Sequence, residues 1–270
     1  MDQGTVTSYR LARSRADLEL APGERVVAGG TWLYSEPQVA VTGFVDITTM
    51  EWPHLEYPPD GGLIVGSTCT IAELTNLPQR AGWRAQPLFL QCASALLASF
   101  KIWNVATVGG NICQSFSAAG MVSLATTLDA TALVWTADGG EYRLPVAELM
   151  TGNGTNRLAP GDVLRSIAFP EDSLRARTGY RKIALAELGR SGAVLTGRVD
   201  EDGQCLFAIT AATLTPTVLR FAELPSARQL RDAVDAADGF YTDPLGSADW
   251  RRGVSGVLLE EIREGLGRAT

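Results

Sequence analysis

The chain has 270 residues, of which 46% are hydrophobic and 20% charged, a composition typical of a folded globular protein rather than a disordered or fibrous one. Its net charge of −7 does not favour binding to nucleic-acid phosphates or anionic lipid, because both require clustered Lys and Arg. No stretch has the roughly 20 consecutive apolar residues that cross a bilayer, so we expect no membrane contact and a cytoplasmic location.

The cysteines and the single histidine do not form a recognisable metal site. Cys69, Cys92, Cys113 and Cys205 lie far apart in the sequence and contain no C-x-x-C pair of the kind found in zinc and iron–sulfur sites. His54 follows a proline in a predicted turn, and one imidazole does not supply the several histidines of most metal centres. The sequence therefore predicts no bound metal and buried thiols.

The first hundred or so residues contain two predicted strands and two predicted helices. An apolar run over 25–30 ends in two glycines, which is typical of a buried strand entering a tight turn. A second strand is predicted at 63–65, ending at Gly66-Ser67. The spacing of Thr70 and Glu73 predicts a capping box at a helix start, and apolar residues at helical spacing predict a further helix over 87–100.

A glycine-containing loop is predicted over 107–112, followed by a helix in the apolar run 121–128. Strand-forming residues on both sides of Asp138-Gly139-Gly140 predict a hairpin over 131–144. A second hairpin is predicted over 192–210, around the turn residues 200–203. Two amphipathic helical tracts follow, over 226–237 and 247–265.

Two Gly-Gly pairs stand out chemically. The first glycine pair, Gly29–Gly30, is followed by Thr31, and the second glycine pair, Gly109–Gly110, lies between Thr107 and Asn111. Glycine lets consecutive backbone amides turn toward an anion without a Cβ in the way, and hydroxyl and amide side chains add donors. Two such loops together suit a pyrophosphate, whereas either pair alone is more typical of a plain turn. The G-x-G-x-x-G and P-loop fingerprints are both absent, so neither of those site designs is predicted.

These stretches, taken together, resemble the FAD-binding medium subunit of the molybdenum hydroxylases, the family that contains xanthine dehydrogenase and carbon monoxide dehydrogenase. The matching segments are VVAGGTWL at 26–33, GLIVGSTCTIAEL at 62–74, NVATVGGNICQSFSAAGMVSLATTLDATALVW at 104–135, GYRKIALAE at 179–187 and DPLGSADWRRGVSGVLLEEI at 243–262. The resemblance covers nearly the whole chain.

The resemblance implies an α+β fold. A two-subdomain FAD-binding domain would span 1–172, with subdomains of about 1–57 and 58–172. A smaller C-terminal domain would span 173–270 and combine a three-stranded antiparallel sheet with helices.

The resemblance also implies which residues bind the cofactor, FAD, without a covalent bond. The first loop would supply Ala28, Gly29, Gly30 and Thr31, and the second Thr107, Gly109, Gly110 and Asn111. Trp32 departs from the family pattern, which usually has a small or acidic residue there, and would stack on a ring system or pack within the protein. Lys182 would stabilise negative charge on the reduced flavin, or lie solvated on the surface. No catalytic acid or base is expected.

One departure from the family pattern concerns the cofactor's hydroxyl groups. After the second loop the family usually reads Ser-Pro-x-x-Asp, whereas this chain reads Ser117-Ala118-Ala119-Gly120-Met121. The expected carboxylate is therefore missing at Met121, which predicts weaker FAD binding or an altered pose.

The leading functional hypothesis is an electron-transfer subunit of a heteromeric molybdenum hydroxylase. Its partners would be a molybdopterin-binding large subunit and an iron–sulfur small subunit, and its FAD would pass electrons to NAD or another small-molecule acceptor. Two alternatives remain open: a stand-alone flavin-dependent oxidoreductase acting on a small molecule, and a scaffold or binding protein that has lost FAD.

Overall fold

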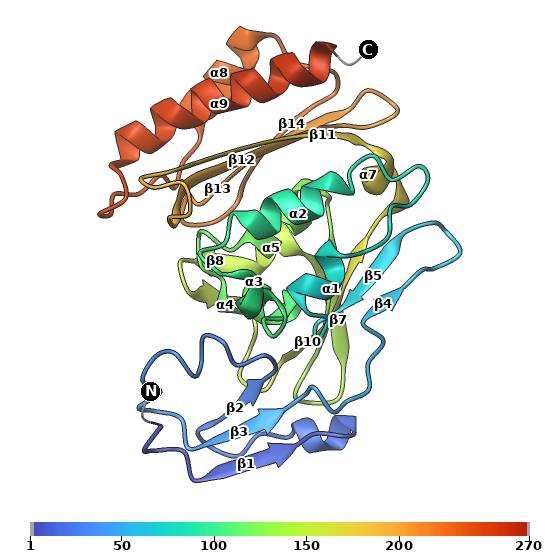
Figure 1. Cartoon of the computed structure of the whole chain (residues 1–270), viewed down its shortest axis with the longest axis vertical. Coiled ribbons are helices and arrows are strands. Elements are labelled where there is room, and N and C mark those ends of the chain that lie inside the picture. The colour runs from blue at the N-terminus through green and yellow to red at the C-terminus, as the bar shows by residue number, and fades with distance from the viewer. Residues whose placement is uncertain (1–2, 269–270) are drawn as a thin grey trace.

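The computed structural model describes residues 3–268 as sheets and helices stacked in layers along the long axis of the molecule (Figure 1). The N-terminal sheet lies at one end and the two longest helices lie at the other. The mixed helix and sheet content confirms the predicted α+β class. No helix within 3–268 is long and apolar enough to cross a membrane.

A small parallel sheet forms the N-terminal layer, in the order β1-β3-β2. Its elements are β1 (Ser8–Leu11), the 3-10 helix η1 (Arg15–Leu18), β2 (Glu24–Val27) and β3 (Gly43–Asp46). All four residues of the central strand β3 are buried. The predicted strand before the first glycine pair is confirmed as β2, so the chain leaves this sheet at Val27 and enters the glycine loop directly.

A five-stranded antiparallel sheet forms the middle of the molecule, in the order β4-β5-β10-β6-β7. The strands are β4 (Leu55–Glu56), β5 (Leu63–Gly66), β6 (Thr131–Trp135), β7 (Glu141–Pro145) and β10 (Val163–Phe169). The predicted strand at 63–65 and the hairpin over 131–144 are confirmed as β5 and β6-β7. The central strand β10 was not predicted, because its nearly continuous burial leaves no alternating pattern.

Short helices cover this sheet and surround its edges (Figure 1). They are α1 (Ile71–Thr75), α2 (Pro87–Ser94), α3 (Phe100–Trp103), α4 (Val108–Gln114), α5 (Gly120–Thr127), α6 (Val146–Leu149) and α7 (Glu171–Arg175), with a small β8 (Met150–Gly152) and β9 (Thr155–Asn156) hairpin. The capping box at α1 is confirmed: Thr70 Oγ1 accepts from the Glu73 amide at 3.1 Å, and the Glu73 carboxylate accepts from the Thr70 amide at 2.7 Å. The helix predicted from Pro87 ends earlier than expected, at Ser94.

The prediction of a loop at the second glycine pair was wrong. Gly109 and Gly110 lie in the first turn of α4, and Thr107 is its N-cap. Glycine disfavours a helix interior by about 1 kcal/mol relative to Ala, which is why the sequence predicts a turn here. Tertiary contacts to the end of β5 outweigh this local preference, since the Val108 and Gly109 amides donate to the carbonyls of Cys69 and Ser67.

A four-stranded antiparallel sheet and two helices form the C-terminal layers. They are β11 (Arg177–Ala184), β12 (Ser191–Val199), β13 (Cys205–Thr210), β14 (Thr217–Phe221), α8 (Ala227–Ala236) and α9 (Ala248–Arg268). The predicted hairpin and both helical tracts are confirmed. The implied number of three strands is corrected to four. Helix α9 packs against β11 and β12, and α5 packs against β12 and β13, so all nine residues of β12 are buried.

Buried polar contacts join the C-terminal sheet to α5. Ser123 Oγ lies 2.6 Å from Thr210 Oγ1, and Thr127 Oγ1 lies 2.6 Å from Thr196 Oγ1. All four hydroxyl groups belong to buried residues, where unpaired polar atoms are unfavourable. These pairs therefore fix how the C-terminal sheet lies on α5, the helix that follows the second glycine pair.

Candidate functional site

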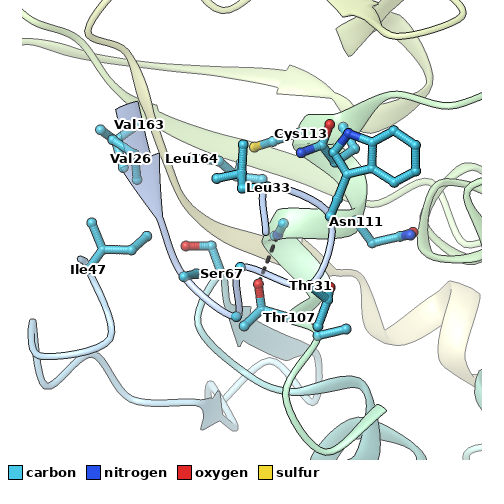
Figure 2. A pocket seen from close by; sticks show the side chains of 18 of the residues that line it. Val26, Thr31, Leu33, Ile47, Ser67, Thr107, Asn111, Cys113, Val163 and Leu164 are labelled. Carbon is cyan, nitrogen blue, oxygen red and sulfur yellow. Dashed lines mark hydrogen bonds between the residues drawn. The ribbon is translucent and has the colours of Figure 1, made fainter. Parts of the chain in front are cut away.

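The two glycine pairs meet at a cavity of about 220 Å³ (Figure 2). The N-terminal sheet contributes Val26 to its wall, the residue after β3 contributes Ile47, and β10 contributes Val163 and Leu164. Nine of the ten predicted binding residues line this cavity. They are Ala28, Gly29, Gly30, Thr31, Trp32, Thr107, Gly109, Gly110 and Asn111.

The first glycine pair requires glycine for two separate reasons. Gly30 has φ +64°, in the left-handed region that side chains disfavour. A Cβ at Gly29 would overlap the backbone carbonyl of Val105, which precedes the second glycine pair by a few residues. The two loops therefore touch through backbone atoms.

The backbone amides of the first loop are free. Within residues 3–268, the amides of Gly29, Gly30 and Thr31 donate to no protein acceptor, although the Gly30 carbonyl accepts from the Tyr34 amide at 2.9 Å. All three residues are half-buried, so their amides are accessible to water or to a ligand. Adjacent backbone N–H groups of this kind form anion-binding concavities.

The amides of the second glycine pair are already used inside the protein. The Gly109 amide donates to the Ser67 carbonyl at 3.1 Å, and the Gly110 amide donates to Thr107 Oγ1 at 3.0 Å, the dashed line in Figure 2. A Cβ at Gly109 would overlap the side chain and backbone of Ser67. Because the two glycines have no side chains, the first turn of α4 lies directly against the end of β5, and its backbone forms part of the cavity wall.

Asn111 is held in place by the backbone of Met121, the residue that stands where the family usually has Asp. Its Oδ1 accepts from the Met121 amide at 3.0 Å, whereas the Met121 side chain is buried in the core of the middle layer. The cavity nevertheless contains a carboxylate, that of Asp162, just before β10. Asp162 Oδ2 accepts from the Ala159 amide at 3.0 Å and from the Tyr142 hydroxyl at 3.2 Å. Asp162 was not predicted as a site residue because it directly precedes β10, a strand that the sequence pattern did not predict.

Trp32, on the first loop, and Cys113, on α4, also line the cavity. The Trp32 ring packs edge-on against Phe116, with ring centroids 4.6 Å apart and an interplanar angle of 68°. Burial raises the pKa of the Cys113 thiol to about 12, so this thiol stays neutral. The cysteine therefore contributes neither a nucleophile nor negative charge to the cavity.

Lys182 lies apart from these residues. It belongs to β11, and its Nζ lies 3.5 Å from the carbonyl oxygens of Ser94 and Glu187. Burial lowers the pKa of its ammonium group. It does not line the cavity, whose walls within residues 3–268 include neither Lys nor Arg. Backbone dipoles and neutral donors are therefore the groups available to an anion there.

The described part of the chain also holds no cluster of three or more His, Cys, Asp or Glu side chains suited to a metal ion. The cavity thus brings unpaired amides, hydroxyls and one carboxylate together between the parallel N-terminal sheet and the middle layer, a set of groups able to hold an anion. Because the P-loop and G-x-G-x-x-G patterns are absent, this class of site differs from those nucleotide-binding designs.

Residues 9–172 match the family described as the FAD binding domain in molybdopterin dehydrogenase. The chain belongs to this family, and FAD is its cofactor. The chain is 26% identical over 199 residues to the nicotinate dehydrogenase FAD-subunit of Eubacterium barkeri, which covers 68% of this chain and 64% of that protein. It is 29% identical over 171 residues to a xanthine dehydrogenase FAD-binding subunit of Escherichia coli O157:H7, which covers 60% and 57%. Each match spans less than two thirds of the relative's own length.

Solved structures share the fold over 98% of the chain. A reconstituted CO dehydrogenase from Oligotropha carboxidovorans aligns with a TM-score of 0.82 at 19% identity, covering 98% of both chains. A quinoline 2-oxidoreductase from Pseudomonas putida 86 aligns with a TM-score of 0.79 at 18% identity, covering 98% of this chain and 99% of that one. At this level of identity the likeness shows the fold alone.

Proposed function

We propose that this chain is the FAD-binding, electron-transfer subunit of a cytoplasmic molybdenum hydroxylase complex. Its partners would be a molybdopterin-binding large subunit and an iron–sulfur small subunit. Electrons from the iron–sulfur subunit would pass through the FAD of this chain to NAD or another small acceptor. The family match supports the cofactor, and the named relatives, which are FAD subunits of dehydrogenases, support the kind of assembly.

The free amides at Gly29, Gly30 and Thr31 are the observation that carries this proposal. These amides have no hydrogen-bond acceptor within residues 3–268, and they belong to residues that line the same cavity as the second glycine pair. A diphosphate supplies several acceptor oxygens and negative charge, which these donors would satisfy. The residues present therefore fit the central part of FAD.

The chain's own residues would bind and orient the cofactor rather than perform acid–base chemistry. The first glycine loop would hold the diphosphate, Thr31 would add a hydroxyl donor, and Asp162 would offer a carboxylate acceptor for hydroxyl groups. Asp162 thus supplies the type of group that is missing at Met121. When bound, FAD supplies the redox chemistry itself.

The visible spectrum of the purified full-length chain tests the proposal. We expect flavin absorption near one FAD per chain after purification or after reconstitution with FAD. Co-expression with the adjacent reading frames should yield a complex that contains molybdenum and iron. A folded chain that neither retains nor takes up FAD would contradict the proposal and favour the scaffold hypothesis. Substrate turnover by the chain alone would instead favour the stand-alone oxidoreductase.

A further inference from the structure

Ser67 carries a buried hydroxyl without a hydrogen-bond partner. The residue is 3% exposed, and its Oγ meets no donor or acceptor of the protein within residues 3–268. Leaving a buried hydroxyl unpaired is unfavourable, and most such groups in folded proteins are paired. The proposed binding residues do not include Ser67, so its position needs a separate explanation.

The backbone of Ser67 is fixed on both sides. Its amide donates to the Arg165 carbonyl at 3.1 Å, and its carbonyl accepts from the Gly109 amide at 3.1 Å. The side chain fills the space that a Cβ at Gly109 would occupy. Ser67 thus sits rigidly between β10 and α4, and only its hydroxyl is left to make a further contact.

The hydroxyl faces the apolar side of the cavity. Ser67 lines the cavity, and in Figure 2 its oxygen points away from Thr107, toward the side where Val26 and Ile47 lie. Val163 and Leu164 belong to the same cavity wall. The cavity therefore has two unlike parts: a polar part at the first glycine loop, and an apolar part reached by this single hydroxyl.

The chemistry of the apolar part favours the adenosine half of the dinucleotide. A diphosphate needs several donors, and these are available at the first glycine loop instead. The volume of about 220 Å³ is also smaller than the roughly 300–1,000 Å³ typical of sites that enclose drug-sized ligands. Reduced flavin carries negative charge, and within residues 3–268 the cavity wall offers no Lys or Arg to balance it, whereas adenosine is neutral and suits an apolar wall with one hydroxyl.

We propose that Ser67 is a cofactor-binding residue, and that its hydroxyl hydrogen-bonds the adenosine half of FAD in the apolar part of the cavity. This inference rests on the proposed FAD function and adds a contact that the glycine pairs do not provide. It also explains why an unpaired hydroxyl is kept in a buried position, because the ligand supplies the missing partner.

The substitution Ser67→Ala tests the assignment in the full chain after removal of flavin. Titration calorimetry with FAD, ADP and FMN should show FAD and ADP binding weakened roughly 3- to 10-fold, as expected for one lost hydrogen bond, and FMN binding unchanged. The melting temperature of the flavin-free variant should not fall, because the substitution removes an unpaired group. Unchanged ADP binding, or a loss confined to FMN, would overturn the inference.

Ser255→Ala is the matched control. Ser255 lies on α9, is fully buried, and its Oγ is likewise unpaired, but it does not line the cavity. We expect the same stability response as for Ser67→Ala and no change in affinity for any of the three ligands. If the unmodified chain binds FAD but Ser67→Ala behaves like Ser255→Ala, only the Ser67 assignment fails. If the unmodified chain binds neither FAD nor ADP, the proposed function itself fails.

Discussion

Gly29–Gly30 and Gly109–Gly110 line one cavity, yet they serve it differently. The first pair follows β2 in an open loop, and its amides meet no acceptor among the residues that the structure describes. The second pair starts α4, and its amides are bonded to Ser67 and Thr107. Two identical dipeptides thus have two physical roles: the first presents donors to a ligand, and the second removes side chains so that a helix can pack against β5. The four predictions below test this difference, beginning with the largest effect.

Gly110→Asp should abolish FAD retention. A Cβ at this position meets only Thr107 Oγ1, at 2.8 Å, so the chain should still fold, but the new carboxylate would lie at the cavity wall. Two like charges ~4 Å apart repel by about 4 kcal/mol at an effective dielectric constant of 20, enough to prevent binding of a diphosphate. Gly253→Asp is the control, because Gly253 lies on α9 with open space around it. Normal flavin content in folded Gly110→Asp would contradict the site assignment.

Gly109→Ala should mainly destabilise the fold. Its Cβ would overlap Ser67, whose backbone is fixed by hydrogen bonds on both sides and cannot move freely. Overpacking of this kind reduces the free energy of unfolding by about 1–3 kcal/mol. Urea denaturation of the flavin-free chain measures this quantity. A variant as stable as the unmodified chain would show that α4 does not depend on close packing at this glycine.

Gly30→Ala should show the opposite balance, with FAD affinity reduced more than stability. The left-handed backbone at φ +64° disfavours alanine by about 1–2 kcal/mol, and the Cβ would meet the Tyr34 ring, which is 42% exposed although it packs edge-on against Phe44. Relaxation of the loop would displace its free amides. Gly139→Ala provides the control, since Gly139 has φ +90° and no neighbour within 4 Å. Equal loss of FAD affinity in both variants would remove the distinction between the two glycine pairs.

Thr107→Val should have the smallest effect on the free energy of unfolding, but it should change the affinity for FAD measurably. It removes the N-cap of α4, a change that typically lowers stability by about 1 kcal/mol, and it releases the Gly110 amide at the cavity wall. Thr70→Val removes the corresponding cap of α1, where Thr70 Oγ1 accepts from the Glu73 amide. Both variants should unfold at similarly reduced urea concentrations, and only Thr107→Val should alter FAD affinity. An identical FAD affinity in both would limit Thr107 to a purely structural role.

Short sequence patterns of capping and turn residues predicted much of the secondary structure. The Thr70–Glu73 capping box, the turn at Asp138-Gly139-Gly140 and the hairpin around residues 200–203 each predict an element that the structure confirms. In each case the decisive hydrogen bonds join residues close in sequence, so their formation depends little on the rest of the chain. The strands β1, β3 and β10 were not predicted, because their short or fully buried segments lack a distinctive period.

The candidate site was predicted in part. The glycine pairs, Thr31, Thr107 and Asn111 carry a recognisable pattern, and the structure brings them to one cavity. Asp162 reaches the cavity at the start of β10, and Ser67 reaches it at the end of β5, two strands that pair in the middle sheet. The polar residue at the end of the predicted strand 63–65 was the one available signal for Ser67. Lys182 belongs to a segment that resembles the family, but it lies outside the cavity, against the C-terminal end of α2.

The amino-acid sequence alone determined where glycine gives the backbone freedom, where helices are capped and where hairpins turn, because these properties depend on neighbouring residues. Only the tertiary structure decided which glycine amides remain free. The Gly109 amide is used because the carbonyl of Ser67, distant in sequence, lies within hydrogen-bonding distance, whereas no described residue near β2 brings such an acceptor to Gly29 and Gly30. Whether a donor is available to a ligand therefore depends on which distant carbonyl the fold places beside it.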